Sequence, residues 1–155
     1  MNRILSLVAT FAFGLFFITC EALSQNKIYR NVSNDAIEKV LQSLELKYQK
    51  AERKDKDSTT MYFDFTRGGQ PFRLYNYGND LWIECTFEKK LKAEDINRWN
   101  ADAKFSRLVQ IEQKEKTLLS LEAQLDCMGG VTDAIMKQYI NRFDEEAKKF
   151  AKFLK

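Results

Sequence analysis

Histidine is absent from the 155 residues of this chain, so the most common general base near neutral pH is missing. Cysteine is scarce, with three residues in all. Structural zinc sites are built mainly from cysteine and histidine, so the composition predicts no zinc site. We also expect no other cofactor.

Glycine and proline are scarce as well, with six and one residues. The pairs Gly68-Gly69 and Gly129-Gly130 are predicted to be turns, because neither belongs to a phosphate-binding loop between a strand and a helix. No stretch rich in Pro, Gly or Ser and no internal repeat divides the chain. The adjacent carboxylates at residues 94–95 and 145–146 point apart on predicted helices. We therefore expect one domain over residues 25–155, without enzymatic activity.

A strong excess of charge is also lacking. The formal net charge is +3, and Lys and Arg mostly alternate with Asp and Glu. Nucleic-acid-binding domains usually carry a clustered basic patch, so we expect no nucleic-acid partner. The composition, 45% hydrophobic and 30% charged, is that of an ordinary globular protein.

One long apolar run is present, over residues 4–18. Ala22 and Ser24 follow it, at the small-residue positions of a cleavage site before Gln25, which is the anatomy of a secretory signal peptide. The run is shorter than the about 20 apolar residues that a membrane span needs. The sequence therefore predicts a signal peptide over residues 1–24 and an exported protein, periplasmic or secreted.

Two alternatives would keep the N-terminal segment in place. In the first, residues 4–20 stay as a membrane anchor. In the second, Cys20 carries a lipid, although residues 17–19 match a lipidation motif poorly. Either would attach the protein to a membrane through this segment alone.

Removal of the signal peptide leaves Cys85 and Cys127. In an oxidising compartment the two could form a disulfide. Both also lie on the apolar side of predicted strands, where two unreactive buried thiols would fit as well. The sequence leaves both readings open.

The apolar periodicity predicts an α+β domain in which one antiparallel sheet is flanked by helices, in the order α-β-β-β-α-β-β-α. A further segment, residues 46–51, could be a strand, and residues 52–57 are expected to be a charged loop. The final helix carries an apolar series that begins at Ile135. The predicted elements are a helix over 34–44, strands over 61–65, 72–75 and 81–87, a helix over 93–103, strands over 105–112 and 117–127, and a helix from 133 to about 153.

Two aromatic residues lie out of phase with the core positions of their strands. In the strand over 81–87, Leu81, Ile83 and Cys85 share one face, and Trp82 lies on the other. Tyr75 has the corresponding phase in its own strand. Aromatic side chains outside the core suit a binding surface, so Tyr75 and Trp82 are the predicted interaction residues. The alternative is that a helix covers this face too.

Two segments, NRWNADAKFS at residues 97–106 and MGGVT at residues 128–132, resemble the YbjN domain family of bacteria. Asn97, Trp99, Asn100 and Phe105 match the first part of that pattern, and Gly129, Gly130, Val131 and Thr132 match the second. The resemblance implies a fold like that of class I type III secretion chaperones and a role in sensory transduction. Many relatives look cytoplasmic, whereas this chain carries an export signal.

The matched residues also have physical roles of their own. Trp99 is expected to anchor a helix on the sheet, Asn97 and Asn100 to bind nearby backbone, and Gly129-Gly130 to allow a sharp strand-to-helix turn. Together with the resemblance, this favours an exported, chaperone- or adaptor-like module that binds a protein or peptide, with a homodimer as one form. The alternative is a small-ligand sensor or carrier in the cell envelope, with its pocket between the sheet and the final helix.

Overall fold

A computed structural model of the chain describes residues 27–155. The predicted signal peptide over 1–24, the alternative anchor over 4–20 and Cys20 lie outside the described residues. In the described part, no helix has the length and apolar character needed to cross a bilayer.

The described residues form an α+β domain with one antiparallel sheet of six strands in the order β1-β2-β3-β4-β6-β5. The predicted fold class and order of elements are confirmed. Residues 46–51 contribute to a strand that pairs with β2 and extends to Lys54, so the first half of the expected charged loop is strand. The elements are α1 (Asn34–Ser43), β1 (Tyr48–Lys54), β2 (Thr59–Arg67), β3 (Gln70–Asn76), β4 (Asp80–Phe87), α2 (Ala93–Asp102), β5 (Arg107–Glu112), β6 (Thr117–Asp126) and α3 (Asp133–Phe153).

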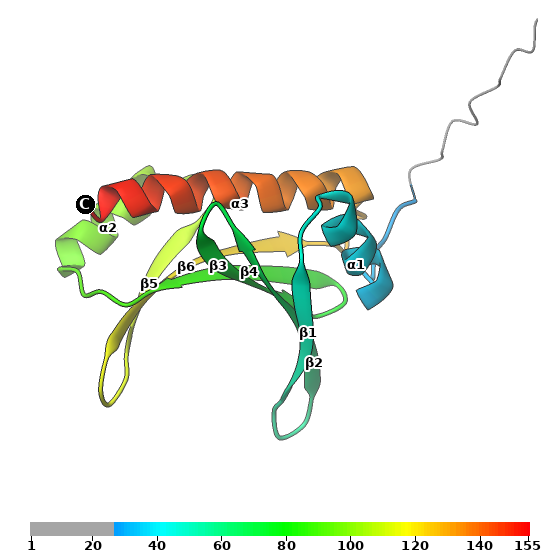
Figure 1. Cartoon of the computed structure of the whole chain (residues 1–155), viewed down its shortest axis with the longest axis horizontal. Helices are drawn as coiled ribbons and strands as arrows, with labels where there is room; N and C mark the ends of the chain where they lie inside the picture. The colour runs from blue at the N-terminus through cyan, green and yellow to red at the C-terminus, as the bar shows by residue number, and fades with distance from the viewer. Residues whose placement is uncertain (1–26) are drawn as a thin grey trace, which may run out of the picture.

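The three helices lie on one face of the sheet, with α3 running along it, and the β1–β2 and β5–β6 hairpins extend away on the other side (Figure 1). Aromatic residues dominate the layer between helices and sheet. Phe72 of β3 meets Phe143 of α3 with ring centroids 5.4 Å apart, and Phe63 and Phe150 in the same core are also fully buried. Burial of each such side chain contributes about 2–3 kcal/mol, so this layer holds the helices on the sheet.

The buried face of the final helix begins at Met136 and not, as expected, at Ile135. Met136 is buried, whereas Ile135 is 39% exposed, because the buried stripe continues through Tyr139, Ile140 and Phe143. The Tyr139 hydroxyl lies 2.8 Å from the Ala123 carbonyl oxygen of β6 and 3.2 Å from that of Leu81 in β4. Burial strongly raises the pKa of this hydroxyl. It therefore stays protonated and donates to the sheet.

Hydroxyl side chains cap the starts of two helices. The Ser33 hydroxyl accepts the Ala36 amide at the start of α1, and the Thr132 hydroxyl accepts the Ile135 amide at the start of α3. Before Thr132, Gly130 has φ +96°, and a Cβ there would lie 2.7 Å from the Ile28 side chain. Gly130 thus makes the turn that the glycine pair was expected to make.

The second helix is tied to the molecule by two of its motif residues. Trp99 is buried and packs edge-on against Phe150 and Phe153 of α3, with ring centroids 4.9 and 5.5 Å apart. Asn100 hydrogen-bonds to the backbone of Leu108 in β5. Asn97 is exposed.

Of the two readings that the sequence leaves open for Cys85 and Cys127, the structure has the second: both residues are buried free thiols. Cys85 lies opposite Leu121, while the Cys127 amide bonds to the Asn79 carbonyl. Six residues of strand separate the two positions, about 20 Å at 3.4 Å per residue. A disulfide requires Cα atoms within about 7 Å.

Candidate functional site: the open face of the sheet

The sheet face turned away from the helices is free of helical cover in residues 27–155 (Figure 1). The cross-strand register defines which side chains share this face, which we call the open face. Its principal residues are Gln49 and Ala51 of β1, Tyr62, Asp64 and Thr66 of β2, Arg73 and Tyr75 of β3, Trp82, Glu84 and Thr86 of β4, Ser120, Glu122 and Gln124 of β6, and Arg107, Val109 and Ile111 of β5.

One row of polar side chains crosses all six strands. Successive cross-strand partners in this row, which we call the charged row, are Gln49, Asp64, Arg73, Glu84, Glu122 and Arg107. The Arg73 guanidinium binds Asp64 through two hydrogen bonds of 2.7 and 2.8 Å. At the other end, Arg107 binds Glu122 at 3.0 Å, and the Glu122 side chain is only 10% exposed. The row therefore contains two ion pairs with Glu84 between them.

Glu84 is the one charged member of this row without an ion pair among the described residues. Its carboxylate accepts a hydrogen bond from the Tyr75 hydroxyl at 3.2 Å, and its cross-strand neighbour is the acidic Glu122. Burial raises the pKa of Glu84, and the charge of Glu122 adds to the rise, whereas the Tyr75 hydrogen bond and Arg73 oppose it. The charged form of Glu84 is thus less well solvated than in water.

An aromatic row runs beside the charged row. Tyr62, Tyr75 and Trp82 are successive cross-strand partners, with Ala51 and Gln124 at the ends. The Tyr62 and Tyr75 rings lie 5.8 Å apart. This row brings together aromatic side chains from three neighbouring strands.

The two predicted interaction residues both lie on the open face, but they differ in exposure. Tyr75 is 7% exposed, so it is not the exposed contact that its phase suggested. The rings of Tyr62 and Tyr77 pack against it, at 5.8 and 6.2 Å. Trp82 is partly exposed, with the Arg107 guanidinium 4.8 Å from its ring centroid. Trp82 is therefore the better contact residue of the two.

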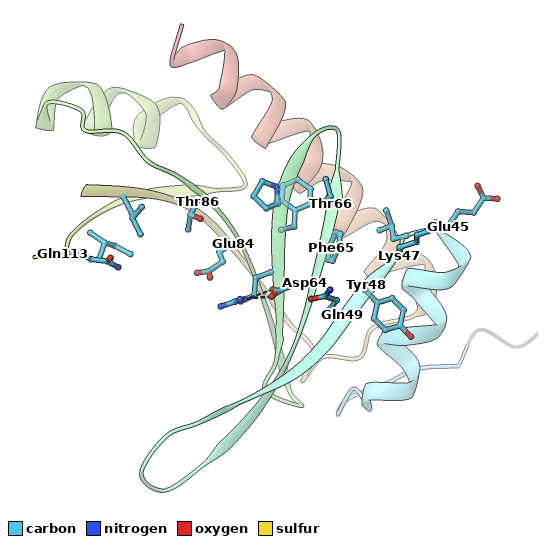
Figure 2. Close-up of a pocket in the computed structure, with 16 residues that line it drawn as sticks. Glu45, Lys47, Tyr48, Gln49, Asp64, Phe65, Thr66, Glu84, Thr86 and Gln113 are labelled. Atoms are coloured by element: carbon cyan, nitrogen blue, oxygen red, sulfur yellow. Dashed lines mark hydrogen bonds and ion pairs between the residues drawn. The ribbon is translucent and has the colours of Figure 1, made fainter. Parts of the chain in front are cut away.

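A broad groove of about 1150 Å³ occupies part of this face and continues around the edge of the sheet beside β1. Figure 2 shows Glu84 and Thr86 between Gln113 on one side and Asp64 and Gln49 on the other. Its charged lining residues are three carboxylates and two cations, Glu45, Asp64, Glu84, Lys47 and Arg73. A smaller hollow of about 150 Å³ lies at Trp82, Phe105, Arg107 and Glu122.

Ser120 lies next to the charged row, and its hydroxyl makes no hydrogen bond within the described residues. It belongs to the open face, between Thr86 on β4 and Val109 on β5, and is fully buried. Its Oγ has no hydrogen-bond partner in the described part of the chain. A buried hydroxyl without a partner costs roughly 1–3 kcal/mol, so this position favours an additional polar group or water nearby.

The motif residues shared with the resembled family lie mostly away from this face. Trp99 and Asn100 hold α2, and residues 129–132 form the turn into α3, whereas Phe105 lines the hollow beside Trp82. Sequence reasoning missed Arg73, Glu84, Arg107 and Glu122. Their alternation along the strands places them outside the core, but only the register across strands shows that they form one row.

The two cysteines of the described chain lie in the hydrophobic core and not on the open face. Burial raises the pKa of the thiols of Cys85 and Cys127, to about 12 and about 11, so both stay in the unreactive thiol form. Within residues 27–155, no three His, Cys, Asp or Glu side chains are placed to hold a metal ion. The aromatic rings and arginines of the open face are, by contrast, residue types enriched at protein interfaces.

Comparison with known proteins gives a family and a fold. The family model for YbjN, described as "putative bacterial sensory transduction regulator", matches residues 33–155. Among solved structures, the crystal structure of YbjN from E. coli, titled a "putative transcription regulator", is similar with a TM-score of 0.60 and 14% sequence identity. The match covers 75% of this chain and 86% of that chain. The search of curated proteins finds no significant match. The chain, matched by the family model over most of its length, belongs to the YbjN family.

Proposed function

We propose that this YbjN-family protein is an exported, chaperone- or adaptor-like module that binds a polypeptide on the open face of its sheet. One observation carries the proposal: the charged and aromatic rows form a continuous surface that no helix of residues 27–155 covers. The groove on this face, about 1150 Å³, is larger than the roughly 300–1,000 Å³ of a typical small-molecule pocket. The family's description as a regulator agrees with binding in place of catalysis.

The face is a better binding surface than the sheet edges. At the β5 edge, the Asn100 side chain already binds the N–H and C=O of Leu108, and Gln110 accepts the Leu91 amide. At the β1 edge, four of the last five residues are charged, from Lys50 to Lys54. Charged and occupied edges discourage the addition of another strand.

A small-ligand sensor or carrier is the alternative. Its expected pocket, between the sheet and α3, is the place where Phe72 and Phe143 pack against each other and where Phe150 is fully buried as well. The two cavities described above lie on the open face and its edges. We therefore place polypeptide binding first.

Export is the second part of the proposal. It rests on the apolar run over residues 4–18 and the small residues before Gln25. The intact mass of the protein recovered outside the cytoplasm tests it. A mass that begins at Gln25 is expected, whereas a full-length or lipid-modified mass would support one of the two anchored alternatives.

The binding test is affinity capture of the tagged exported protein from a crosslinked cell envelope, followed by mass spectrometry. The wild type and the variants W82Q and I135Q are compared. Ile135 is a matched control, because it is a partly exposed apolar side chain on the helical side. We expect one stoichiometric polypeptide with the wild type and with I135Q, and its loss with W82Q.

Two results would contradict this assignment. Equal capture by W82Q and the wild type would move the contact surface away from the open face. Recovery of the protein alone would point to a self-associating domain, for which a homodimer is the simplest form, and the search would then turn to small ligands.

A further inference from the structure

We propose that the open face recognises a basic side chain, Lys or Arg, of an extended polypeptide, and that Glu84 is the carboxylate that receives it. This inference rests on the proposed function and names the chemistry of the partner. It follows from the pairing of charges, the shape of the groove and the polar groups around Glu84.

Charge pairing leaves Glu84 available. Asp64 is bound by Arg73 through two hydrogen bonds, and Glu122 is bound by Arg107 at 3.0 Å. Glu84 lies between these pairs, and its one hydrogen-bond donor within residues 27–155 is the neutral Tyr75 hydroxyl. A cation placed here would meet the Glu84 carboxylate between two cross-strand neighbours, the acidic Glu122 on one side and Arg73 on the other, and the charge of Arg73 is already balanced by Asp64.

The surroundings of Glu84 can accept the hydrogen bonds of an ammonium or guanidinium group. Thr86 lies two residues from Glu84 on β4 and is exposed on the same groove. Lys offers three donors and Arg five, all of which need acceptors when they leave water. The Glu84 carboxylate and the Thr86 hydroxyl, which both line the groove, supply such acceptors.

The neighbouring row suits the rest of a basic side chain. Trp82 and Tyr75 are cross-strand partners in the aromatic row, which runs next to the charged row that contains Glu84. The methylene stems of Lys and Arg pack well on apolar and aromatic surfaces while their charged ends remain at polar groups. A basic residue can therefore place its stem over Trp82 and its charge at Glu84.

The width of the open face suits an extended peptide, whereas its side chains do not form a metal-binding cluster. Six strands about 4.8 Å apart give a surface about 24 Å wide, which roughly seven or eight extended residues cross. Metal ligation would need further ligands, and residues 27–155 hold no group of three or more of the usual acidic, cysteine or histidine ligands. The carboxylates outnumber the cations along the groove, which favours a cationic occupant.

The test begins with selection of short random peptides from a displayed library on the purified exported protein. We expect the selected peptides to be enriched in Lys or Arg. In the best binder, the basic residue is then replaced by its neutral analogue, citrulline for Arg or acetyl-lysine for Lys. This replacement should weaken binding to the wild type by about tenfold or more, because a charge-assisted hydrogen bond is lost.

The variant Glu84→Gln keeps the shape of the side chain and removes its charge. With E84Q, the charged peptide and its neutral analogue should bind with affinities within about twofold of each other. Glu145→Gln is the matched control, since Glu145 is a well-exposed carboxylate on α3, and it should keep the full preference. Circular dichroism confirms that each variant is folded before binding is measured.

The outcomes separate this inference from the proposed function. Peptides that depend on Trp82 but show no basic preference, or a preference that persists in E84Q, would overturn the inference and leave polypeptide binding intact. Failure to select any peptide would overturn both. Calcium binding by the wild type that disappears in E84Q, measured with CaCl₂ alone, would overturn the inference, because the occupant of the Glu84 site would then be a divalent cation and not a basic side chain.

Discussion

Asn100 binds both backbone polar groups of Leu108, donating to its carbonyl oxygen at 3.0 Å and accepting its amide at short range, 2.6 Å. Because Leu108 lies on the edge strand β5, this side chain occupies positions that another strand would otherwise use. The second asparagine of the N-x-W-N segment therefore has a structural role: it ties α2 to the sheet and closes part of its edge.

Replacing Asn100 with Ala should lower the free energy of unfolding by about 1–3 kcal/mol, because the Leu108 amide and carbonyl lose their partners. Urea unfolding measures this loss. Asn97→Ala is the control, and since Asn97 is exposed its effect should stay within about 0.5 kcal/mol. Equal effects of the two substitutions would show that Asn100 has no special role.

Glu84→Gln should raise the melting temperature at neutral pH. The folded-state pKa of Glu84 is raised, first by burial and then by Glu122, against Tyr75, Arg73 and Arg53, so its ionised form costs stability. A raised pKa means that stability rises as the pH falls through it, because the folded protein holds the proton more tightly. The advantage of the variant should shrink as the pH falls toward the ordinary value of 4.5. A melting temperature that is unchanged or lower at pH 7 would contradict this reading.

The two tryptophans should differ sharply in their effect on stability. Trp99→Ala removes a ring packed against Phe150 and Phe153 and should cost about 3–5 kcal/mol. Trp82→Gln removes a partly exposed ring on the open face and should cost about 1 kcal/mol. Chemical denaturation of both variants tests the difference. A large loss for Trp82 would place it among the core residues.

Gly130→Ala should destabilise the protein, whereas Gly129→Ala should be nearly neutral. Gly130 has φ +96° and lies against Ile28, so an added Cβ meets strain and a contact of 2.7 Å. Gly129 has open space around its Cβ position. A loss of about 1–3 kcal/mol at Gly130 is expected from backbone strain of this kind. Thermal unfolding of the two variants measures the difference, and equal losses of stability would contradict the prediction.

Thiol titration should find both cysteines of residues 25–155 free. In denaturant without reductant, the exported protein should yield two reactive thiols, and the native protein should react slowly because Cys85 and Cys127 are buried. Burial also raises the pKa of both thiols, which lowers the fraction of reactive thiolate. Detection of fewer than two thiols after denaturation would indicate that Cys85 and Cys127 form a disulfide.

Periodicity predicted the elements well where one face is buried. The alternation of residues 117–127 predicted β6, and the helices predicted to start at residues 34 and 133 do start there. Periodicity did not predict which residue begins the buried face of α3, because Ile135 and Met136 are adjacent apolar residues and only packing decides which one is buried. Similarly, the phase of Tyr75 was right, but its exposure depended on Tyr62 and Tyr77.

The amino-acid sequence by itself determined the fold class, the order of the elements and the family, because these depend on local periodicity, turn chemistry and short motifs. Only the tertiary structure decided that β6 lies between β4 and β5, which places Glu122 beside Glu84 although helix α2 and strand β5 separate them along the chain. The physical reason is that pairing between distant strands is selected by the packing of the whole sheet. The charged row is a product of that pairing.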